Sequence, residues 1–134
     1  MKISSKGRYA VAVMVDIAMA NKEFVSIAEI SSRQNITVKY LEQIISKLVK
    51  ANLLTSCRGI AGGYKLNKPP KDYTIAEILY ATGDMPKIVP CRMEGAVCPE
   101  KDKCHTIGVW EGLSAIIYDY LNKVSLQDLI DKTL

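Results

Sequence analysis

Between residues 26 and 66 the chain carries the pattern of a short helix, a tight turn, a longer helix and a glycine-rich hairpin, one directly after the other. Ser26 and Glu29 have the spacing of a capping box that begins a helix. Residues 34–36 form the turn, and Thr37 is the expected cap of the longer helix. This order is the helix-turn-helix arrangement, and it predicts a mainly helical domain.

The hairpin that follows narrows the fold further. Residues 53–58 are predicted to form a strand, residues 59–63 a turn rich in glycine, and residues 64–66 the returning strand. A glycine-rich loop also suits a nucleotide phosphate, but that site needs a helix after the loop. Here a strand and two prolines follow. We therefore predict a mainly α fold with a small β-hairpin wing, which is a winged helix-turn-helix.

Helical periodicity predicts further helices on both sides of this unit. The expected helices cover about residues 5–20, 26–33, 37–51, 74–82 and 104–123, and a short helix begins after residue 125. The long one would extend about 29 Å, and one small domain cannot easily cover such a helix. We expect it to pack on a second copy of the chain; folding back onto its own domain is the alternative. The residues expected at this dimer interface are Ile107, Trp110, Leu113, Ile117, Tyr120 and Leu121.

At 134 residues the chain has the length of one compact domain. Within it we distinguish three parts. Residues 1–83 form the winged-helix region, residues 84–103 a loop that carries cysteines, and residues 104–134 the dimerisation helix with the final short helix. A loop of about twenty residues without structure is unusual in a compact domain and tends to be functional.

Charge is distributed unevenly along the chain. Residues 1–70 hold 11 Lys and Arg against 4 Asp and Glu, a net charge of +7, whereas residues 71–134 have a net charge of −3. A basic half suggests that this half faces a polyanion, with chance segregation of surface charge as the alternative. No apolar run approaches the ~18 residues that cross a bilayer, and the N-terminus lacks a signal-peptide pattern. We therefore expect a cytoplasmic protein with no membrane partner.

Three of the four cysteines, Cys91, Cys98 and Cys104, lie within 14 residues. In a cytoplasmic chain such a cluster more often binds metal or does redox chemistry than forms disulfides. The gaps of six and five residues are wider than the short Cys-x2–4-Cys pairs of structural zinc sites, and a wide loop suits an iron–sulfur cluster. Zinc and free thiols are the alternatives. Cys57 lies far from these three, and we expect a small, half-buried apolar residue there.

Four motifs together resemble one known family. Residues 1–10 (MKISSKGRYA), 40–43 (YLEQ), 58–59 (RG) and 62–64 (GGY), followed by the clustered cysteines, resemble the IscR-like regulators of the Rrf-two superfamily, which also holds NsrR and CymR. The similarity covers nearly the whole chain in one order. It implies a homodimeric bacterial transcription factor, usually a repressor and not an enzyme. Cluster-bearing members sense iron–sulfur status, iron, redox state or nitric oxide, and we expect [2Fe-2S] rather than [4Fe-4S].

The resemblance and the helix-turn-helix pattern both predict double-stranded DNA as the partner. The second helix of the pair would enter a major groove, the start of the first helix would hold phosphates, and Arg58 would reach a minor groove from the wing. A twofold dimer of this kind binds an imperfect palindrome. For Lys47 and Lys50 we expect solvated surface charges. The residues expected to contact DNA are Ser4, Ser5, Lys6, Arg8, Thr37, Val38, Lys39, Tyr40, Glu42, Gln43, Arg58, Gly59, Gly62, Gly63 and Tyr64.

The clustered cysteines are the metal ligands that the resemblance implies, but the chain departs from the family pattern in two places. The first gap has six residues where five is usual, and Ile107 stands where the IscR type has a histidine. His105 is the only histidine of the chain and the natural fourth ligand; a helix-start residue facing solvent is the alternative. Further oxygen candidates are Glu94, Glu100 and Asp102.

Two other functions fit the same residues. The first is a cluster-free repressor of the same fold that depends on thiols or zinc, and iron content distinguishes it. The second is an iron–sulfur redox protein. A tight, sequence-specific complex with DNA would exclude electron transfer as the main role.

Overall fold

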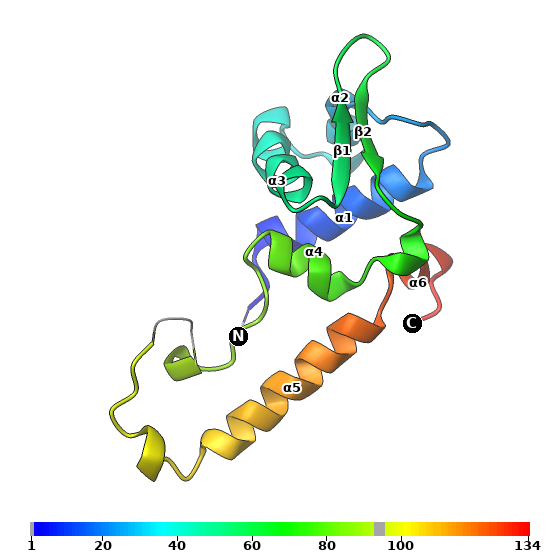
Figure 1. Cartoon of the computed structure of the whole chain (residues 1–134). Coiled ribbons are helices and arrows are strands. Elements are labelled where there is room, and N and C mark those ends of the chain that lie inside the picture. The colour runs from blue at the N-terminus through cyan, green and yellow to red at the C-terminus, as the bar shows by residue number, and fades with distance from the viewer. Residues whose placement is uncertain (1, 93–95) are drawn as a thin grey trace.

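The described part of the chain, residues 2–92 and 96–134 of a computed structural model, contains six α-helices, three single-turn 3-10 helices and one antiparallel hairpin (Figure 1). This architecture confirms the predicted winged helix-turn-helix. In chain order the elements are α1 (Ser5–Met19), α2 (Ile27–Gln34), α3 (Val38–Lys50), β1 (Leu54–Cys57), β2 (Gly63–Leu66), η1 (Pro70–Asp72), α4 (Ile75–Ala81), η2 (Pro90–Arg92), η3 (Lys101–Lys103), α5 (Ile107–Lys123) and α6 (Leu126–Asp131).

Helices α2 and α3 form the helix-turn-helix, and local side-chain bonds set its turn. Ser26 Oγ accepts a bond from the Glu29 amide at 3.2 Å, and the Glu29 carboxylate accepts one from the Ser26 amide at 2.9 Å, which confirms the predicted capping box. Asn35 follows α2 in the left-handed conformation, with φ of 53°. Thr37 then caps α3 by accepting from the Tyr40 amide. The predicted starts of both helices are therefore confirmed.

The capping carboxylate of α2 is held in its ionised form. Lys22 donates to Glu29 at 2.6 Å, and this bond together with the bond from the Ser26 amide lowers the pKa of Glu29 to about 2. The same device recurs at α4 and α6, where Glu77 and Asp128 occupy the matching position of a capping box. The sequence pattern is therefore a reliable guide to helix starts in this chain, because the bonds that it predicts are local.

A buried carboxylate joins α1 to α2. Asp16 lies on the inner side of α1 and is only 7% exposed. The guanidinium of Arg33 donates to both of its oxygens, at 2.6 Å for the shortest bond, and the amide of Gln34 donates to one of them at 2.8 Å. These bonds raise the pKa of Arg33. Because a buried carboxylate is costly without partners, this clamp sets how α2 lies on α1 and where the turn into α3 begins.

The core lies between α1, α3, α4 and the base of the hairpin. The predicted inner face of α3 is buried; its residues are Leu41, Ile44, Ile45 and Leu48. Tyr73, between η1 and α4, is fully buried as well. Its hydroxyl donates to the Leu53 carbonyl at 2.7 Å and accepts from the amides of Asn67 (2.8 Å) and Lys68 (3.3 Å). One phenol thus satisfies backbone groups on both sides of the hairpin's base.

The wing is a short ladder that is bonded to the segment before α2. Its strands pair with Leu54 opposite Leu66 and Cys57 opposite Gly63. Val25, just before α2, exchanges two backbone bonds with Tyr64 of β2, at 2.9 and 2.8 Å. Gly63 has φ of 150°, and a β-carbon there would lie 2.3 Å from the Val25 carbonyl oxygen. Only glycine permits this close approach.

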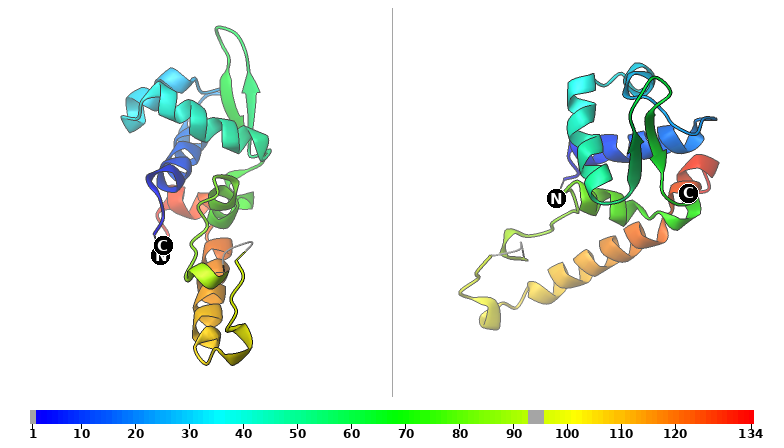
Figure 2. Two further views of the ribbon diagram at one scale, coloured as in Figure 1. Left: turned by 90° about the vertical axis from the view of Figure 1, so that its left-hand side faces the viewer. Right: turned by 45° about the horizontal axis from the view of Figure 1, so that its top comes forward.

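Helix α5 projects from the body as an arm, and the cysteine loop runs out along it before the chain turns back (Figures 1 and 2). The predicted helix start at Cys104 was wrong by three residues. The Cys104 amide donates to the Lys101 carbonyl and closes η3, so α5 begins at Ile107. Two single-turn helices, η2 and η3, lie in the loop that was expected to lack structure. No residue of α5 is buried.

After the arm, the chain returns to the body. Leu126 of α6 is fully buried, and its amide donates to the Tyr73 carbonyl at 3.0 Å. The Ile75 amide at the start of α4 donates to the Val124 carbonyl at 3.1 Å. The base of α5 is therefore anchored while its outer turns project. Among the described residues, no helix has the length and apolar character needed to cross a membrane.

Tyr73 generates a stability prediction. Replacing it with Phe removes the hydroxyl and leaves the buried Leu53 carbonyl and the Asn67 amide without this partner. We expect Tyr73→Phe to lower the free energy of unfolding by about 1–3 kcal/mol. Urea denaturation at a fixed protein concentration measures it. The control is Tyr80→Phe, because Tyr80 is 78% exposed. Equal unfolding midpoints for the two variants would show that the buried bonds do not contribute.

Candidate DNA-binding surface and cysteine cavity

The first turns of α3 present a polar face to the outside. Five of the predicted DNA-contacting residues are exposed there, and Tyr40 beside them is half-buried. The exposed residues are Thr37, Val38, Lys39, Glu42 and Gln43. Glutamine can bind adenine through two hydrogen bonds, and glutamate can accept one from cytosine. This face therefore has the chemistry of a helix that reads bases.

The N-terminal turn of α1 lies beside the start of α3. The rings of Tyr9 and Tyr40 meet edge to face, with 5.9 Å between centroids and 82° between planes. Ser4 caps α1 by accepting from an amide of its first turn, and Arg8 is exposed and donates to Ser5 Oγ at 3.2 Å. The structure thus brings the predicted phosphate-contacting segment next to the predicted base-contacting helix. Lys6, the remaining member, is paired with Asp84 at 3.7 Å.

The wing carries its basic side chain at the start of the loop. Arg58 is exposed and follows β1 directly. Gly59 has φ of 117°, and a β-carbon on Gly62 would lie 2.2 Å from the Cys57 carbonyl oxygen. The wing glycines therefore have a backbone role that needs no DNA. The predicted half-burial of Cys57 was wrong: its side chain is exposed, because the outer part of β1 extends beyond the body of the domain.

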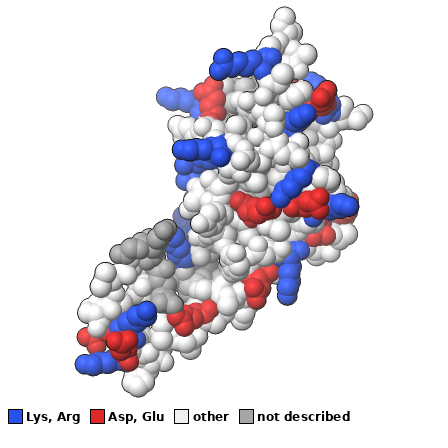
Figure 3. Space-filling view, in the orientation of Figure 1, with Lys and Arg blue, Asp and Glu red and all other residues white. Residues whose placement is uncertain are grey.

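Basic side chains lie over the part of the surface that holds α3 and the wing (Figure 3). On the face shown there, acidic side chains become more frequent over α4 and along the arm. The separation follows the sequence, in which residues 1–70 carry the excess of Lys and Arg. This distribution supports a polyanion as the partner of the helix-turn-helix side.

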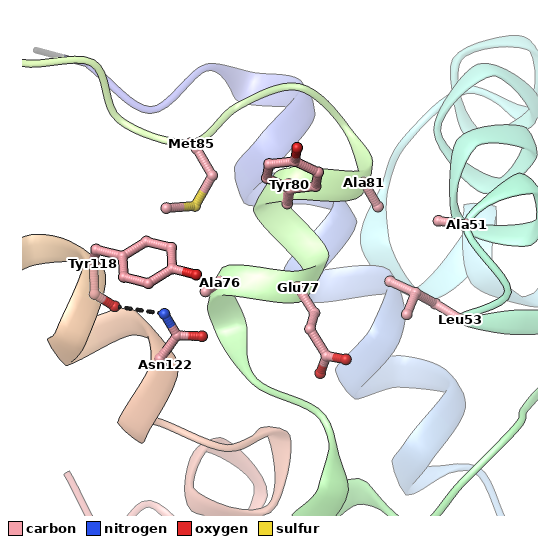
Figure 4. Close-up of a pocket in the computed structure, with 9 residues that line it drawn as sticks. All are labelled: Ala51, Leu53, Ala76, Glu77, Tyr80, Ala81, Met85, Tyr118 and Asn122. Carbon is pink, nitrogen blue, oxygen red and sulfur yellow. Dashed lines mark hydrogen bonds between the residues drawn. The ribbon is translucent and has the colours of Figure 1, made fainter. Parts of the chain in front are cut away.

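An apolar cavity of about 440 Å³ lies between α4 and α5, next to the end of α3 (Figure 4). Met85 extends into it toward Tyr118, and Asn122 donates to the Tyr118 carbonyl at 3.0 Å. Glu77 is the one carboxylate among its lining residues. That side chain already caps α4 and binds Lys68 at 2.9 Å. The cavity therefore lacks the paired acid and base of a catalytic site.

The structure brings the three clustered cysteines together around one small cavity of about 90 Å³ near the outer end of the arm. Cys91 comes from η2, Cys98 from the loop and Cys104 from the turn before α5. Cys91 is exposed and the other two are half-buried. The remaining lining residues are Ala96, Lys101 and Ile107. Lys101 is a basic neighbour of these thiols that sequence reasoning missed, although its place three residues before Cys104 could have indicated it.

The predicted fourth ligands do not line this cavity. His105 is exposed, and so are Glu100 and Asp102. Glu94 lies outside the described residues. Because α5 begins at Ile107, Cys104 and His105 both precede the helix and are not held 100° apart on its surface.

Cys104 is the cysteine with a perturbed acidity. Its sulfur lies 3.4 Å from the Thr106 hydroxyl. The bond from that hydroxyl, together with bonds from the amides of Thr106 and Ile107, lowers the pKa of Cys104 below its ordinary value. The thiolate is the form that binds metal, so the turn before α5 favours the ligating form.

Three thiols are donors of the kind that hold an iron–sulfur cluster, and zinc also binds thiolates. Among the described residues, no three His, Cys, Asp or Glu side chains converge closely enough to share one metal ion. Neither a tetrahedral zinc site nor a cluster site is therefore fully assembled by the described side chains, although a cluster distributes its thiolates over more than one iron. Three soft sulfur donors around one cavity are compatible with the second arrangement.

The exposed apolar stripe of α5 differs in part from the predicted one. Leu113 and Tyr120 are exposed as a dimer interface requires, and Val109 and Ile116 extend the same face at spacings of four, three and four residues. Four other members of the predicted stripe are half-buried: Ile107, Trp110, Ile117 and Leu121. Ile107 lines the cysteine cavity and Leu121 packs on the core of its own chain. The predicted stripe thus combined parts of two faces.

Comparisons with known proteins agree with these features. A family model described as Rrf2, iron-dependent transcriptional regulator, matches residues 3–132. The HTH-type transcriptional regulator IscR of Cereibacter sphaeroides is 41% identical over 135 residues, which cover 97% of this chain and 87% of that protein. IscR of Photorhabdus laumondii is 40% identical over 133 residues, which cover 98% of this chain and 80% of that protein.

Solved structures show the same fold. CymR, the global cysteine regulator of B. subtilis, superposes with a TM-score of 0.78 at 29% identity and covers 98% of each chain. IscR of T. potens superposes with a TM-score of 0.73 at 30% identity, over 100% of this chain and 89% of the other. The resemblance of the sequence to the IscR-like regulators is therefore confirmed, and the chain belongs to the Rrf2 family of transcriptional regulators.

Proposed function

We propose that this protein is a homodimeric repressor whose affinity for an imperfect DNA palindrome is set by an iron–sulfur cluster on Cys91, Cys98 and Cys104. The observation that carries the proposal is the shared cavity, which joins three thiols from three separate segments at the end of the loop. The signal would be iron–sulfur supply, iron, redox state or nitric oxide. A [2Fe-2S] cluster is favoured over [4Fe-4S], and a cytoplasmic location follows from this role.

We assign DNA binding to three surfaces of the winged-helix region. The exposed face of α3 would enter the major groove, with Glu42 and Gln43 at base edges. The first turn of α1, with Ser5 and Arg8, would hold phosphates beside it. Arg58 would reach a minor groove from the wing. The edge-to-face contact of Tyr9 with Tyr40 supports this arrangement, because it holds the first two surfaces together.

Dimerisation is assigned to the outer face of α5. An arm of 17 residues without one buried side chain exposes apolar surface that a partner copy would cover. The proposed seam consists of Val109, Leu113, Ile116 and Tyr120, whose spacing matches the a and d positions of a heptad. Pairing through the arms would also fix the distance between the two copies of α3, and hence the spacing of the half-sites.

The cysteine loop is assigned to sensing. When bound, the cluster would supply a redox- and nitric-oxide-sensitive centre at the end of the arm. The three thiols would hold it, the Thr106 hydroxyl and neighbouring amides would favour the thiolate of Cys104, and His105 in the same turn is the proposed fourth ligand. Ordering of residues 84–103 beside α5 would change the geometry of the dimer and the spacing of its recognition helices.

Removing the wing guanidinium should weaken DNA binding. The probe is a duplex selected from a random-sequence library with the purified protein. We expect Arg58→Ala to lower its affinity about tenfold and to flatten the salt dependence by one ionic contact in each subunit, because one charge per wing leaves the minor groove. Fluorescence anisotropy across a salt series measures both quantities. Lys71→Ala, an exposed change on η1 of the same charge, is the control. Identical curves for Arg58→Ala and the unmodified protein would remove the wing from the interface.

Cluster ligation is tested by anaerobic purification with iron and sulfide assays and an absorption spectrum. We expect two irons and two sulfides per chain, visible bands that bleach in air or nitric oxide, and loss of both in Cys98→Ser. Cys57→Ser should keep them, since Cys57 lies on the wing, away from the cavity. Four irons and four sulfides per chain would establish a [4Fe-4S] cluster instead. A colourless, iron-free protein that still binds DNA would overturn the cluster and leave the thiol- or zinc-dependent repressor, which zinc analysis separates.

A charge on the proposed seam should separate the dimer. Ile116 is 67% exposed in the single chain, and Ile116→Glu would bury a carboxylate between two arms. We expect sedimentation equilibrium to show a dimer for the unmodified protein and a monomer for the variant. Ala115→Glu is the matched control, because it adds the same charge to an exposed position on the adjacent side of α5. Dissociation by the control alone would place the interface on that other side.

A further inference from the structure

Asp84 is the residue at which the cysteine loop leaves the body of the domain. Gly83, with φ of 74°, ends α4, and the Asp84 amide donates back to the Leu79 carbonyl at 2.8 Å. One backbone bond therefore joins Asp84 to α4, while the chain beyond it leads to the cysteines. Its side chain turns toward α1, where one carboxylate oxygen lies 3.7 Å from Lys6 Nζ.

The contact between Asp84 and α1 is close. A β-carbon on Gly7 would lie 2.8 Å from the Asp84 β-carbon and 3.1 Å from its carboxyl carbon. The side chain of Asp84 is only 11% exposed. Its Oδ2 atom is buried and, among the described residues, has no hydrogen bond. A carboxylate that is buried with one long ion pair is incompletely compensated, so its energy depends on the distance to Lys6.

Lys6 is thereby given two possible partners. It lies in the first turn of α1, the segment assigned to DNA phosphates, yet in the free protein its ammonium group is directed to Asp84. Its side chain remains 35% exposed, and a partly exposed ion pair is weak enough for a phosphate to compete with it. The Tyr9–Tyr40 contact connects the same turn to the start of α3.

The chain beyond Asp84 links this pair to the cysteine cavity. Met85 extends into the apolar cavity against α5. Asp84 therefore contacts α1, and the next residue, Met85, contacts the arm. Residues 86–89 line a further cavity with Glu111 and Ser114 of α5, and Cys91 follows directly after η2 begins. A displacement of the loop along the arm would therefore reach Asp84 through a short stretch of anchored backbone.

We propose that Asp84 is a positioning residue that holds Lys6 back from DNA phosphates, and that the cysteine loop alters DNA affinity by moving Asp84. The inference rests on the proposed function, because it assumes DNA binding through the first turn of α1. It adds a specific control point to that function. The loop would act on the number of phosphate contacts, and not only on the spacing of the two recognition helices.

The test uses the full-length protein and the duplex selected above. Asp84→Asn keeps the shape of the side chain and removes its charge. In the iron-free protein we expect several-fold tighter binding and a salt slope steeper by about 1.8, the value for one additional phosphate contact in each subunit of the dimer. Lys6→Gln in the same chain should cancel this gain, so that the double variant matches Lys6→Gln alone. For Asp84→Asn, the DNA affinities of the iron-loaded and the iron-free forms should become more similar than they are for the unmodified protein. The iron content of the loaded form should not change.

Two controls keep the test decisive. Asp72→Asn makes the same charge change at an exposed position on η1 and should leave the salt slope unaltered. If a thermal melt shows that Asp84→Asn is unfolded at the temperature of the binding assay, Asp84→Ser replaces it and should give the same shift in the salt slope. An unchanged slope in the folded Asp84 variants, or a gain that survives Lys6→Gln, would overturn the inference while DNA binding stands. Failure of the unmodified protein to bind any duplex would overturn the proposed function as well.

Discussion

The placement of the recognition helix depends on one buried carboxylate. Asp16 receives three bonds from Arg33 and one from Gln34, and this fixes the end of α2 against α1. Asn35 and the cap of α3 at Thr37 lie within three residues of Gln34, so the bonds to Asp16 also set the direction in which α3 begins. The same helix α1 carries, at its other end, the turn proposed to contact phosphates. One rigid helix therefore sets both parts of the DNA-binding surface in a fixed relation.

The arm obeys a different constraint. Because no residue of α5 is buried, its stability depends on the loop beside it, on its anchored base and on the partner copy proposed above. Two cavities lie between the loop and the arm, and the three cysteines line one of them. The proposed sensing site and the proposed dimer interface thus share one structural element, and a change at the thiols would act where the fold has the least support from its own core. The Asp84 joint lies at the border between this element and the rigid body.

Local signals marked the helix starts reliably, and periodicity identified the inner face of α3 but not the two faces of α5. The capping boxes at Ser26, Thr74 and Ser125 mark helix starts because each depends on bonds over three residues. The stripe predicted for α5 combined two faces, since periodicity shows that a helix is amphipathic but not which side meets its own chain. Cys57 was expected to be half-buried and is exposed, because the length of strand that extends beyond the body is a tertiary property. The predicted roles of the DNA contacts and the division into three parts stay predictions.

The sequence alone determined the winged helix-turn-helix, the resemblance to the IscR-like regulators and the three candidate thiols, because these rest on spacing and on residues close in the chain. Only the tertiary structure decided what meets across long separations. It joined Asp16 to Arg33, brought Cys91, Cys98 and Cys104 around one cavity, and paired Lys6 with a carboxylate 78 positions further along the chain. Such contacts depend on how the elements pack, and the sequence pattern of one chain does not give the distance in space between two elements.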